Sequence, residues 1–282
     1  MNVGIAGLGL IGGSMAKAIH RYAAAHSVFG LEKSGEILET ARLQGVVQAE
    51  LTRENAGELD LLLLALYPDG AIQCLRELAP CLKPGALVVD LCGVKRAVFE
   101  PLLALARAHG LRYVGGHPMA GRELSGYAAA MAELFGGASM ILTPPEGTDR
   151  ATLQLLEAFF KQLGFGRIQY SDPEEHDRII AYTSQLAHVV SCAYVQSPTA
   201  ESHMGFSAGS FRDMTRVAKL NEHMWTQLFL DNREALAEEI EGLSRRLNTY
   251  VRLLRAGDEA ELKQLLKNAR EKKEALEEGE RG

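Results

Sequence analysis

The chain has 282 residues, of which 47% are hydrophobic, and it carries a formal net charge of −6 at pH 7. That length is enough for two domains with hydrophobic cores. A negative charge without a basic run argues against a nucleic-acid partner. The sequence shows neither an apolar segment of membrane-spanning length nor a basic leader with a cleavage site. We therefore expect a cytoplasmic protein with no membrane partner.

Four cysteines stand at positions 74, 81, 92 and 192, without metal-ligand spacing and without a C-x-x-C pair. This pattern is typical of reduced thiols that pack as small hydrophobic side chains in a cytosolic protein. We predict no metal site.

A glycine-rich turn follows the first apolar run, residues 3–6. Gly7, Gly9 and Gly12 have the spacing G-x-G-x-x-G. In a dinucleotide-binding turn these glycines allow a tight turn, close approach of the backbone to a pyrophosphate, and close packing of the next helix on the strand. The helix expected over residues 11–25 would direct its free N–H groups at the phosphates.

An acidic residue follows the second predicted strand, residues 28–31. Glu32 lies twenty residues beyond Gly12, where a carboxylate can accept hydrogen bonds from the adenine ribose and repel a 2′-phosphate. This indicates NAD rather than NADP, although the adjacent Lys33 is a cation. The alternative is a glycine-rich turn beside a surface glutamate. The predicted cofactor-binding residues are Gly7, Gly9, Leu10, Ile11, Gly12 and Glu32.

Helices and apolar strands alternate over the first 170 residues. Further strands are expected at 60–66, 86–91, 112–114, 139–142 and 167–170, and helices at about 33–43, 71–81 and 96–109. Apolar runs without alternation indicate strands covered on both faces, as in a parallel sheet. We therefore predict an α/β fold, with a Rossmann-type doubly wound parallel sheet as the NAD-binding domain, 1–170.

The pattern changes after residue 170. Residues 171–175 combine a capping side chain, a proline and two acids, which is typical of a helix start. Helical periodicity continues to residue 197 and resumes after the Gly/Ser-rich segment 205–210. We predict a smaller all-helical domain, 171–282, for substrate binding and dimerisation. Its last helix, about 258–280, is charged on most faces and would be solvated or packed on a partner.

Three short sequence segments contain the candidate residues for catalysis and substrate binding. DLCGVK at 90–95 and GGHPMAGRELSG at 115–126 each follow a predicted strand, at the edge of the sheet where doubly wound folds bind ligands. The third phrase, GSFRDMTRVA at 209–218, belongs to the helical domain.

Together these phrases resemble the prephenate and arogenate dehydrogenase family of tyrosine biosynthesis. The resemblance spans nearly the whole chain and includes the nucleotide motif, GGHPMAG at 115–121, EEHD at 174–177, SQLAH at 184–188, DMTR at 213–216 and MW at 224–225. It implies an oxidoreductase that converts prephenate to 4-hydroxyphenylpyruvate. Hydride would leave C4 for NAD while the ring carboxylate departs as CO2.

This chemistry needs a proton acceptor and groups that bind anions. A neutral His117 suits the substrate hydroxyl, because the pKa of imidazole is close to neutrality. The alternative is a structural histidine held by the following proline. Arg216 suits a carboxylate, because guanidinium offers a planar fork of donors. The alternative interpretation is that Arg216 forms a surface ion pair with Asp213, three residues earlier on a helix.

The resemblance implies roles for further residues. Glu123 and Asp213 would gate and order the site, and His188 would approach the substrate. Gln185, where relatives commonly have a second histidine, can share a helix face with His188. A core histidine remains the alternative for His188.

The chain departs from the family at Gly93. Relatives usually have serine there, whose hydroxyl touches the catalytic histidine, the substrate hydroxyl and the nicotinamide region. One such hydrogen bond is worth about 0.5–1.5 kcal/mol, and Cys92 or Ser125 could replace it.

His176 would have an orienting or capping role. Trp225 would line the substrate pocket of its own or of a partner subunit, or belong to the core.

Three hypotheses follow. The first is an NAD-dependent prephenate dehydrogenase that also accepts arogenate, or an arogenate dehydrogenase. The second is a β-hydroxy-acid dehydrogenase, against which stands the lack of a lysine-based catalytic phrase in the long helix. The third is a catalytically silent, nucleotide-sensing protein, which Gly93 favours. In each case the partner is a small molecule. We also expect a homodimer, because the apolar helix over 173–197 suggests a shared core.

Overall fold

The computed structural model describes residues 1–121 and 124–281, with residues 279–281 described by their backbone alone. Glu123, predicted to gate the site, lies outside the described residues. The chain divides into two compact units, Met1–Arg233 and Glu234–Gly282. The predicted domain boundary at residue 170 lies within the first unit and stays a prediction.

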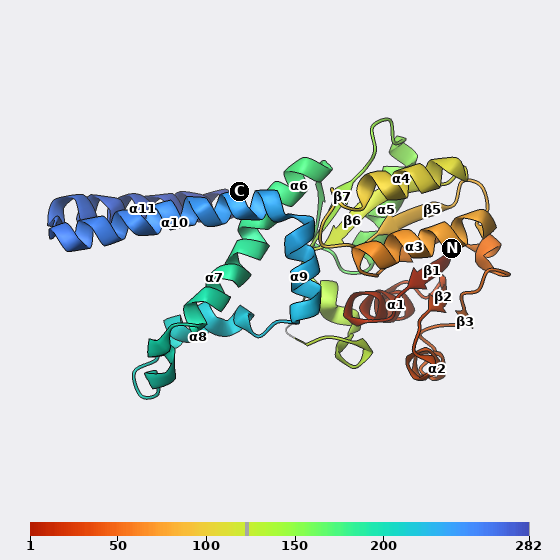
Figure 1. Cartoon of the computed structure of the whole chain (residues 1–282). Helices are drawn as coiled ribbons and strands as arrows, with labels where there is room; N and C mark the ends of the chain where they lie inside the picture. The colour runs from red at the N-terminus through yellow and green to blue at the C-terminus, as the bar shows by residue number, and fades with distance from the viewer. Residues whose placement is uncertain (122–123, 282) are drawn as a thin grey trace. The chain divides into compact units, whose positions relative to one another are not determined.

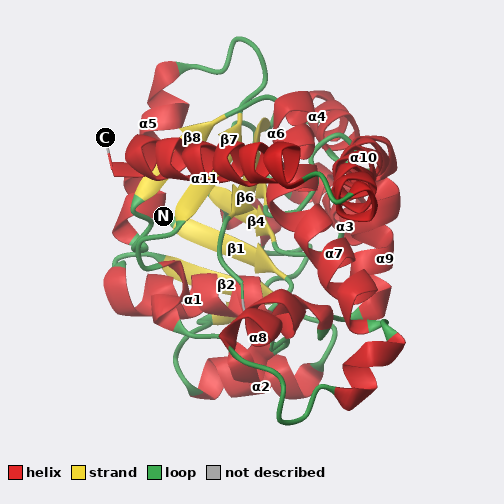
Figure 2. Cartoon of the chain, turned by 90° about the vertical axis from the view of Figure 1, so that its left-hand side faces the viewer, coloured by secondary structure: helices red, strands yellow, loops and turns green. Residues whose placement is uncertain are grey.

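A single eight-stranded sheet forms the centre of the first unit (Figures 1 and 2). Its order is β3-β2-β1-β4-β5-β6-β7-β8, and every neighbouring pair is parallel except β6 and β7. The strands are β1 (Asn2–Ala6), β2 (Ser27–Leu31), β3 (Ala49–Glu50), β4 (Leu61–Leu64), β5 (Leu87–Asp90), β6 (Arg112–Pro118), β7 (Ser139–Thr143) and β8 (Arg167–Tyr170). The predicted doubly wound, mainly parallel fold is confirmed.

Helices cover both faces of this sheet. They are α1 (Leu10–Tyr22), α2 (Gly35–Leu43), α3 (Pro68–Leu78), α4 (Phe99–Ala108) and α5 (Arg150–Gln162). One hydrophobic core contains side chains of α1, α2 and α5, and a second contains side chains of α3 and α4. In β4, alternate leucines enter the two cores, which explains why this strand is apolar throughout.

From residue 173 onward all the regular structure among the described residues is helical. The first unit continues with α6 (Pro173–Ile180), a π-helical turn (Ala181–Gln185), α7 (Leu186–Val195), α8 (Gly209–Thr215) and α9 (Glu222–Asp231). Short 3-10 helices lie at Ala56–Glu58, Ala79–Cys81, Tyr127–Ala129, Ala132–Phe135, Pro198–Ser202 and Arg216–Ala218. The predicted start of α6 is confirmed, since the Asp172 carboxylate accepts a hydrogen bond from Glu175 N at 2.8 Å.

The second unit is formed by two long helices, α10 (Arg233–Ala256) and α11 (Glu259–Arg281), with α10 starting one residue before the boundary. As predicted, α11 is charged on most faces, with exposed ion pairs such as Arg270–Glu274. Among the described residues, no helix combines the length and the apolar character needed to cross a membrane. The cytoplasmic location stays a prediction.

The strand predicted at residues 112–114 is longer in the structure, so its predicted end at Val114 is wrong. β6 continues to Pro118, because Gly115 to Pro118 pair in antiparallel fashion with β7 after the pairing with β5 ends at Gly115. A Cβ on Gly116 would lie 2.8 Å from the Asp90 carbonyl oxygen, so a glycine is needed for this close approach. His117 therefore belongs to a strand, where hydrogen bonds on the β7 side hold its backbone.

Candidate functional site

The glycine-rich turn between β1 and α1 has the geometry of an anion site. Gly7 has φ 87°, and a Cβ there would lie 2.5 Å from the Ala65 carbonyl oxygen. A Cβ on Gly12 would overlap the carbonyl oxygen of Gly7. Around Gly9, by contrast, a Cβ would meet no described atom within 4 Å. The backbone at Gly9 is thus open to a ligand, and α1 begins at the next residue, Leu10, with its N–H groups on this side.

Glu32 lies directly after β2, against this turn. One carboxylate oxygen accepts a hydrogen bond from Leu8 N at 2.8 Å, and the other accepts one from Ser34 N at 3.1 Å. The half-buried carboxylate is therefore held beside the glycines, while Lys33 is exposed. An open backbone, a helix N-terminus and an oriented carboxylate fit the pyrophosphate and adenine ribose of a dinucleotide.

A buried ionic group supports the strand that contains His117. Lys95 pairs with Asp90 and also donates a hydrogen bond to the Gly116 carbonyl oxygen at 2.6 Å. Tyr113 donates to the other oxygen of Asp90 at 2.8 Å, and its pKa is raised by burial and by the negative charge of Asp90. Asp90 and Lys95 were absent from the predicted site. The signal for them was the DLCGVK phrase, in which both are present.

His117 is joined to two residues at the start of the helical region. Its Nδ1 lies 2.9 Å from Nε2 of His176, and Nδ1 of His176 lies 2.7 Å from an oxygen of Asp177. The Asp177 carboxylate also accepts hydrogen bonds from Lys95 N at 2.7 Å and Arg96 N at 2.9 Å. Asp177 was absent from the predicted site, although it completes the EEHD phrase.

Burial lowers the pKa of His117 well below its usual value, and the charges of His176 and Lys95 act in the same direction. Burial also lowers the pKa of His176, against the opposing effect of its hydrogen bond to Asp177. Both rings are therefore neutral near pH 7, and neutral imidazole is a proton acceptor.

Gln185 is fully buried, and the protein itself uses both ends of its amide. Its Nε2 donates to the Leu228 carbonyl oxygen at 3.1 Å, and its Oε1 accepts from Asn232 Nδ2 at 2.8 Å. Asn232 also donates to the Asp177 carbonyl oxygen at 2.8 Å. Gln185 thus joins the π-helical turn to the end of α9, and its contact with substrate stays a prediction.

His188 lies on α7, separate from the histidine pair. Its Nδ1 donates to the Ser184 carbonyl oxygen at 3.0 Å, and its ring stacks on Trp225 with 3.7 Å between centroids. Burial lowers the pKa of His188, and the positive charge of Arg216 contributes in the same direction. Arg216 is therefore close enough to act on His188. Both Arg216 and Asp213 are exposed.

Gly93 faces Nε2 of His117, the ring nitrogen on the side away from His176. A Cβ at this position would lie 3.8 Å from Nε2 of His117 and 3.5 Å from Leu228 Cδ2, which is ordinary van der Waals contact. The family's serine would therefore fit. The Cys92 thiol instead donates to the Leu66 carbonyl oxygen at 3.5 Å and is buried in the second core.

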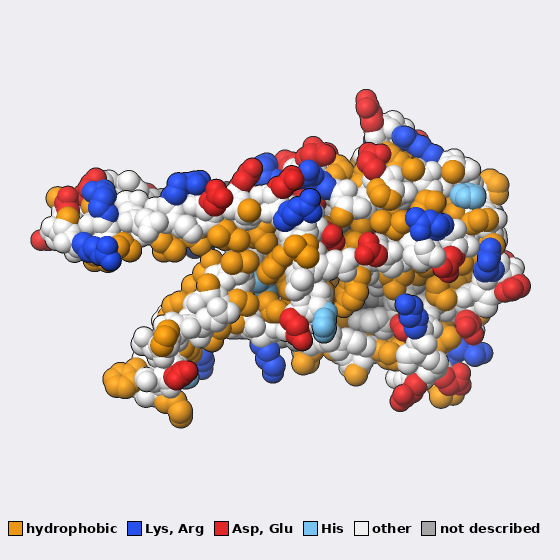
Figure 3. Space-filling view, in the orientation of Figure 1, with side chains coloured by type: hydrophobic (Ala, Val, Ile, Leu, Met, Phe, Trp, Pro, Cys, Tyr) orange, Lys and Arg blue, Asp and Glu red, His pale blue; other side chains and the backbone are white. Residues whose placement is uncertain are grey.

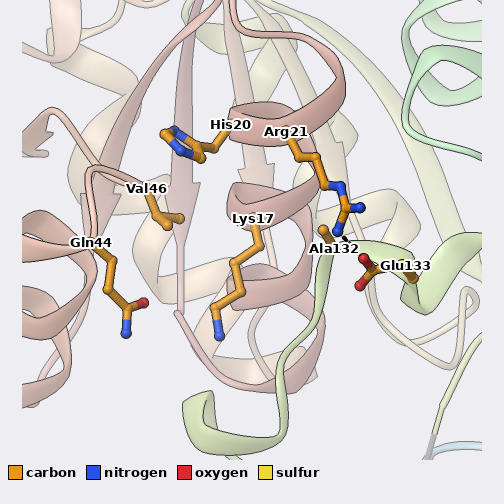
Figure 4. Close-up of a pocket in the computed structure, with 7 residues that line it drawn as sticks. All are labelled: Lys17, His20, Arg21, Gln44, Val46, Ala132 and Glu133. Atoms are coloured by element: carbon orange, nitrogen blue, oxygen red, sulfur yellow. Dashed lines mark hydrogen bonds and ion pairs between the residues drawn. The ribbon is translucent and has the colours of Figure 1, made fainter.

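A cavity of about 430 Å³ lies along α1, outside the predicted site (Figure 4). Its lining residues are Lys17, His20, Arg21, Gln44, Val46, Ala132 and Glu133. Arg21 is paired with Glu133, and Lys17 donates to the Ala130 carbonyl oxygen at 2.8 Å. Since the protein already engages both cations, this cavity is a poor anion site.

A second cavity, of about 620 Å³, lies between the end of α7 and α8. Tyr194, His203 and Phe211 contribute rings to its wall. Hydrophobic side chains are exposed around it, as Figure 3 shows near the tip of these helices, and Phe206 is 93% exposed. This surface is apolar enough to pack against another protein surface.

Comparison with known proteins agrees with this geometry. Residues 15–169 match the family model "Prephenate dehydrogenase, nucleotide-binding domain", and residues 172–268 match "Prephenate dehydrogenase, dimerization domain". These matches cover most of the chain. The protein belongs to the prephenate dehydrogenase family and is an oxidoreductase.

Three relatives illustrate the range of the family. Prephenate dehydrogenase of Lactococcus lactis subsp. cremoris is 29% identical, over 97% of this chain and 77% of its own length. The crystal structure of Synechocystis arogenate dehydrogenase is 28% identical with a TM-score of 0.85, covering 98% of this chain and 100% of that one. Prephenate dehydrogenase from A. aeolicus, in complex with hydroxyphenyl propionate and NAD+, is 31% identical with a TM-score of 0.81, covering 98% of both chains.

Proposed function

We propose that this protein is an NAD-dependent prephenate dehydrogenase that oxidatively decarboxylates prephenate to 4-hydroxyphenylpyruvate. The observation that carries the proposal is the position of His117. It lies at the end of β6 with Nε2 near Gly93 and with a pKa that keeps the ring neutral near pH 7. The family membership and the A. aeolicus complex with NAD+ support the same reaction.

His117 would act on the C4 hydroxyl of the substrate. When bound, the nicotinamide supplies a hydride acceptor. Nε2 of His117 accepts the hydroxyl proton as the hydride leaves C4, and loss of the ring carboxylate as CO2 makes the ring aromatic. Arg216 binds a substrate carboxylate, with His188 beside it and with Asp213 and Glu123 ordering the entrance.

The cofactor residues are those of the glycine-rich turn. The backbone at Gly9, Leu10 and Ile11 would bind the pyrophosphate, Gly7 and Gly12 provide the turn, and Glu32 would accept hydrogen bonds from the adenine ribose. A 2′-phosphate at that position would meet the negative charge of Glu32. We therefore propose NAD as the preferred cofactor.

Arogenate is the second candidate substrate, and the similarity to Synechocystis arogenate dehydrogenase favours it. The two substrates differ only in a keto against an amino group on the side chain. The test measures NADH absorbance with purified protein, NAD and each substrate, and compares kcat/KM. A higher value for arogenate reverses the substrate assignment, and turnover of neither substrate favours the nucleotide-sensing hypothesis.

We further propose two domains, 1–170 for the nucleotide and 171–282 for substrate and dimerisation, with the latter forming a homodimer. The family's dimerization domain, matched over residues 172–268, supports this, as do the exposed Met204 and Phe206. Sedimentation velocity tests the assembly. The wild type should sediment as a dimer, and a monomer at micromolar concentration would exclude it.

A further inference from the structure

We propose that His176 and Asp177 are positioning residues that hold His117 in one tautomer and take over the proton it accepts. The proposal rests on the proposed function for its catalytic consequence. The hydrogen-bonded arrangement of His117, His176 and Asp177 rests on distances among described residues. It can be tested by a measurement that does not require the enzyme to turn over substrate.

Asp177 is fully buried at the start of the helical region. Its carboxylate accepts hydrogen bonds from two backbone N–H groups, Lys95 N and Arg96 N. Because both oxygens of this carboxylate already accept N–H hydrogen bonds, it acts as an acceptor toward its neighbours. The 2.7 Å contact with Nδ1 of His176 therefore requires a proton on that nitrogen.

The tautomer of His176 determines the tautomer of His117. Since neutral His176 has its proton on Nδ1, its Nε2 has a free lone pair and accepts. The 2.9 Å contact then requires that Nδ1 of His117 donates. Consequently Nε2 of His117, the nitrogen near Gly93, has the lone pair needed to accept a proton from substrate. The same logic orients histidine in Asp-His catalytic pairs.

The charges around His176 favour transfer of the proton away from His117. Three charged groups act on His176, namely Lys95, Asp177 and Asp90. Lys95 and Asp90 form an ion pair, which leaves the negative charge of Asp177 in direct contact with His176. Two groups lower the pKa of His117 through their charge, His176 and Lys95, and both are positive in their protonated forms. A positive charge is thus better accommodated on His176 than on His117.

The step balances without a further reactant. The substrate hydroxyl proton bonds to Nε2 of His117, and the Nδ1 proton of His117 passes to Nε2 of His176. His117 ends neutral, and His176 ends as an imidazolium paired with the Asp177 carboxylate. The electron pair of the broken O–H bond remains on oxygen and forms the carbonyl at C4 as the hydride leaves.

Nitrogen NMR of protein labelled with 15N-histidine tests the tautomer directly. Signals are assigned from their loss in His117→Asn and His176→Gln. In the wild type without ligands we expect His117 to be protonated on Nδ1 and bare on Nε2. A wild-type His117 protonated on Nε2 overturns the proposal, whether or not the protein turns over prephenate.

Kinetics of two His176 variants test the relay. His176→Gln keeps an oxygen that can accept from His117 but cannot take its proton near neutral pH, whereas His176→Leu removes both abilities. We expect kcat to fall at least about tenfold in both variants, with KM changed less than about twofold. The acid limb of the kcat profile should also move to lower pH, because His117 would then titrate without its partner.

A purely structural role predicts a different result. His176→Gln would then lower the melting temperature while kcat and the acid limb stay at wild-type values, and this outcome overturns the relay. If neither variant folds, the wild-type NMR measurement still decides the tautomer. A wild type that turns over neither substrate refutes the proposed function and leaves the NMR result valid.

Discussion

A Cβ on Gly93 would lie 3.8 Å from Nε2 of His117, with no described atom of the surroundings closer than 3.5 Å. The backbone at Gly93 is not in the left-handed region that favours glycine. The position therefore accepts a small side chain whose hydroxyl would reach the histidine. This relationship makes the departure from the family testable.

We expect Gly93→Ser to fold normally and to raise kcat by about two- to tenfold, the range that one hydrogen bond of about 0.5–1.5 kcal/mol allows. Gly93→Ala is the matched control, because it fills the same space without a hydroxyl. In a His117→Asn background the serine should have no effect, since it acts through the histidine. Steady-state kinetics of these variants decides the matter. Equal rates for the serine and alanine variants would contradict it.

Substitution of the proposed proton acceptor should affect turnover far more than binding. In His117→Asn we expect kcat to fall by about two to four orders of magnitude, the usual contribution of a general base. Nucleotide affinity, measured by calorimetry, should remain within about twofold. His109→Asn, at an exposed position after α4, is the control and should retain wild-type kcat. Wild-type activity in His117→Asn would refute the mechanism.

Cofactor preference should depend on Glu32. The wild type is expected to bind NAD more tightly than NADP, and Glu32→Ala should reduce the difference by removing ribose hydrogen bonds and charge repulsion. Glu36→Ala, an exposed acid in the first turn of α2, should leave the preference unchanged. Calorimetric titration of both nucleotides measures this. A wild-type preference for NADP would exclude the assigned role of Glu32.

Arg216 should determine substrate affinity. Arg216→Ala is expected to raise KM at least about tenfold with little change in nucleotide affinity. The bound substrate would bury this charge contact, and loss of one partner of a buried charge contact costs about 2–5 kcal/mol. Arg212→Ala removes an exposed arginine from the same segment and serves as the control. If both variants keep the wild-type KM, Arg216 returns to the surface ion-pair hypothesis.

Stability should fall in mild acid. The folded protein holds the pKa of His117, His176 and His188 below the unfolded value of about 6.5. Below that pH the unfolded chain binds more protons, so the free energy of unfolding decreases as pH falls toward the folded pKa values. Each histidine contributes at most about 1.4 kcal/mol per pH unit.

Melting temperatures between pH 7.5 and 5.5 check this dependence. His117→Asn should weaken it, because one of the contributing histidines is gone. His223→Asn, at a highly exposed position, should leave it unchanged. A melting temperature independent of pH over this range would show that these histidines titrate alike in the folded and unfolded states.

Local sequence patterns were sufficient to predict most of the helices and strands. The glycine spacing after β1, the apolar runs and the Asp172-Pro173 helix start are short-range signals, and the elements they predicted are present. Boundaries differed where pairing with a distant strand decided the outcome. β6 runs through His117 because β7, more than twenty residues later in the chain, supplies antiparallel partners for its last four residues.

The candidate site was only partly visible in the sequence. The motifs identified His117 and Arg216 as candidates, and His176 as an orienting residue. The link from His117 through His176 to Asp177, and the support of β6 by Lys95, joins residues up to 82 positions apart. Sequence determined which side chains were available. The tertiary structure decided which of them meet, because hydrogen bonds across such distances depend on how the sheet and α6 pack together rather than on local conformational preference.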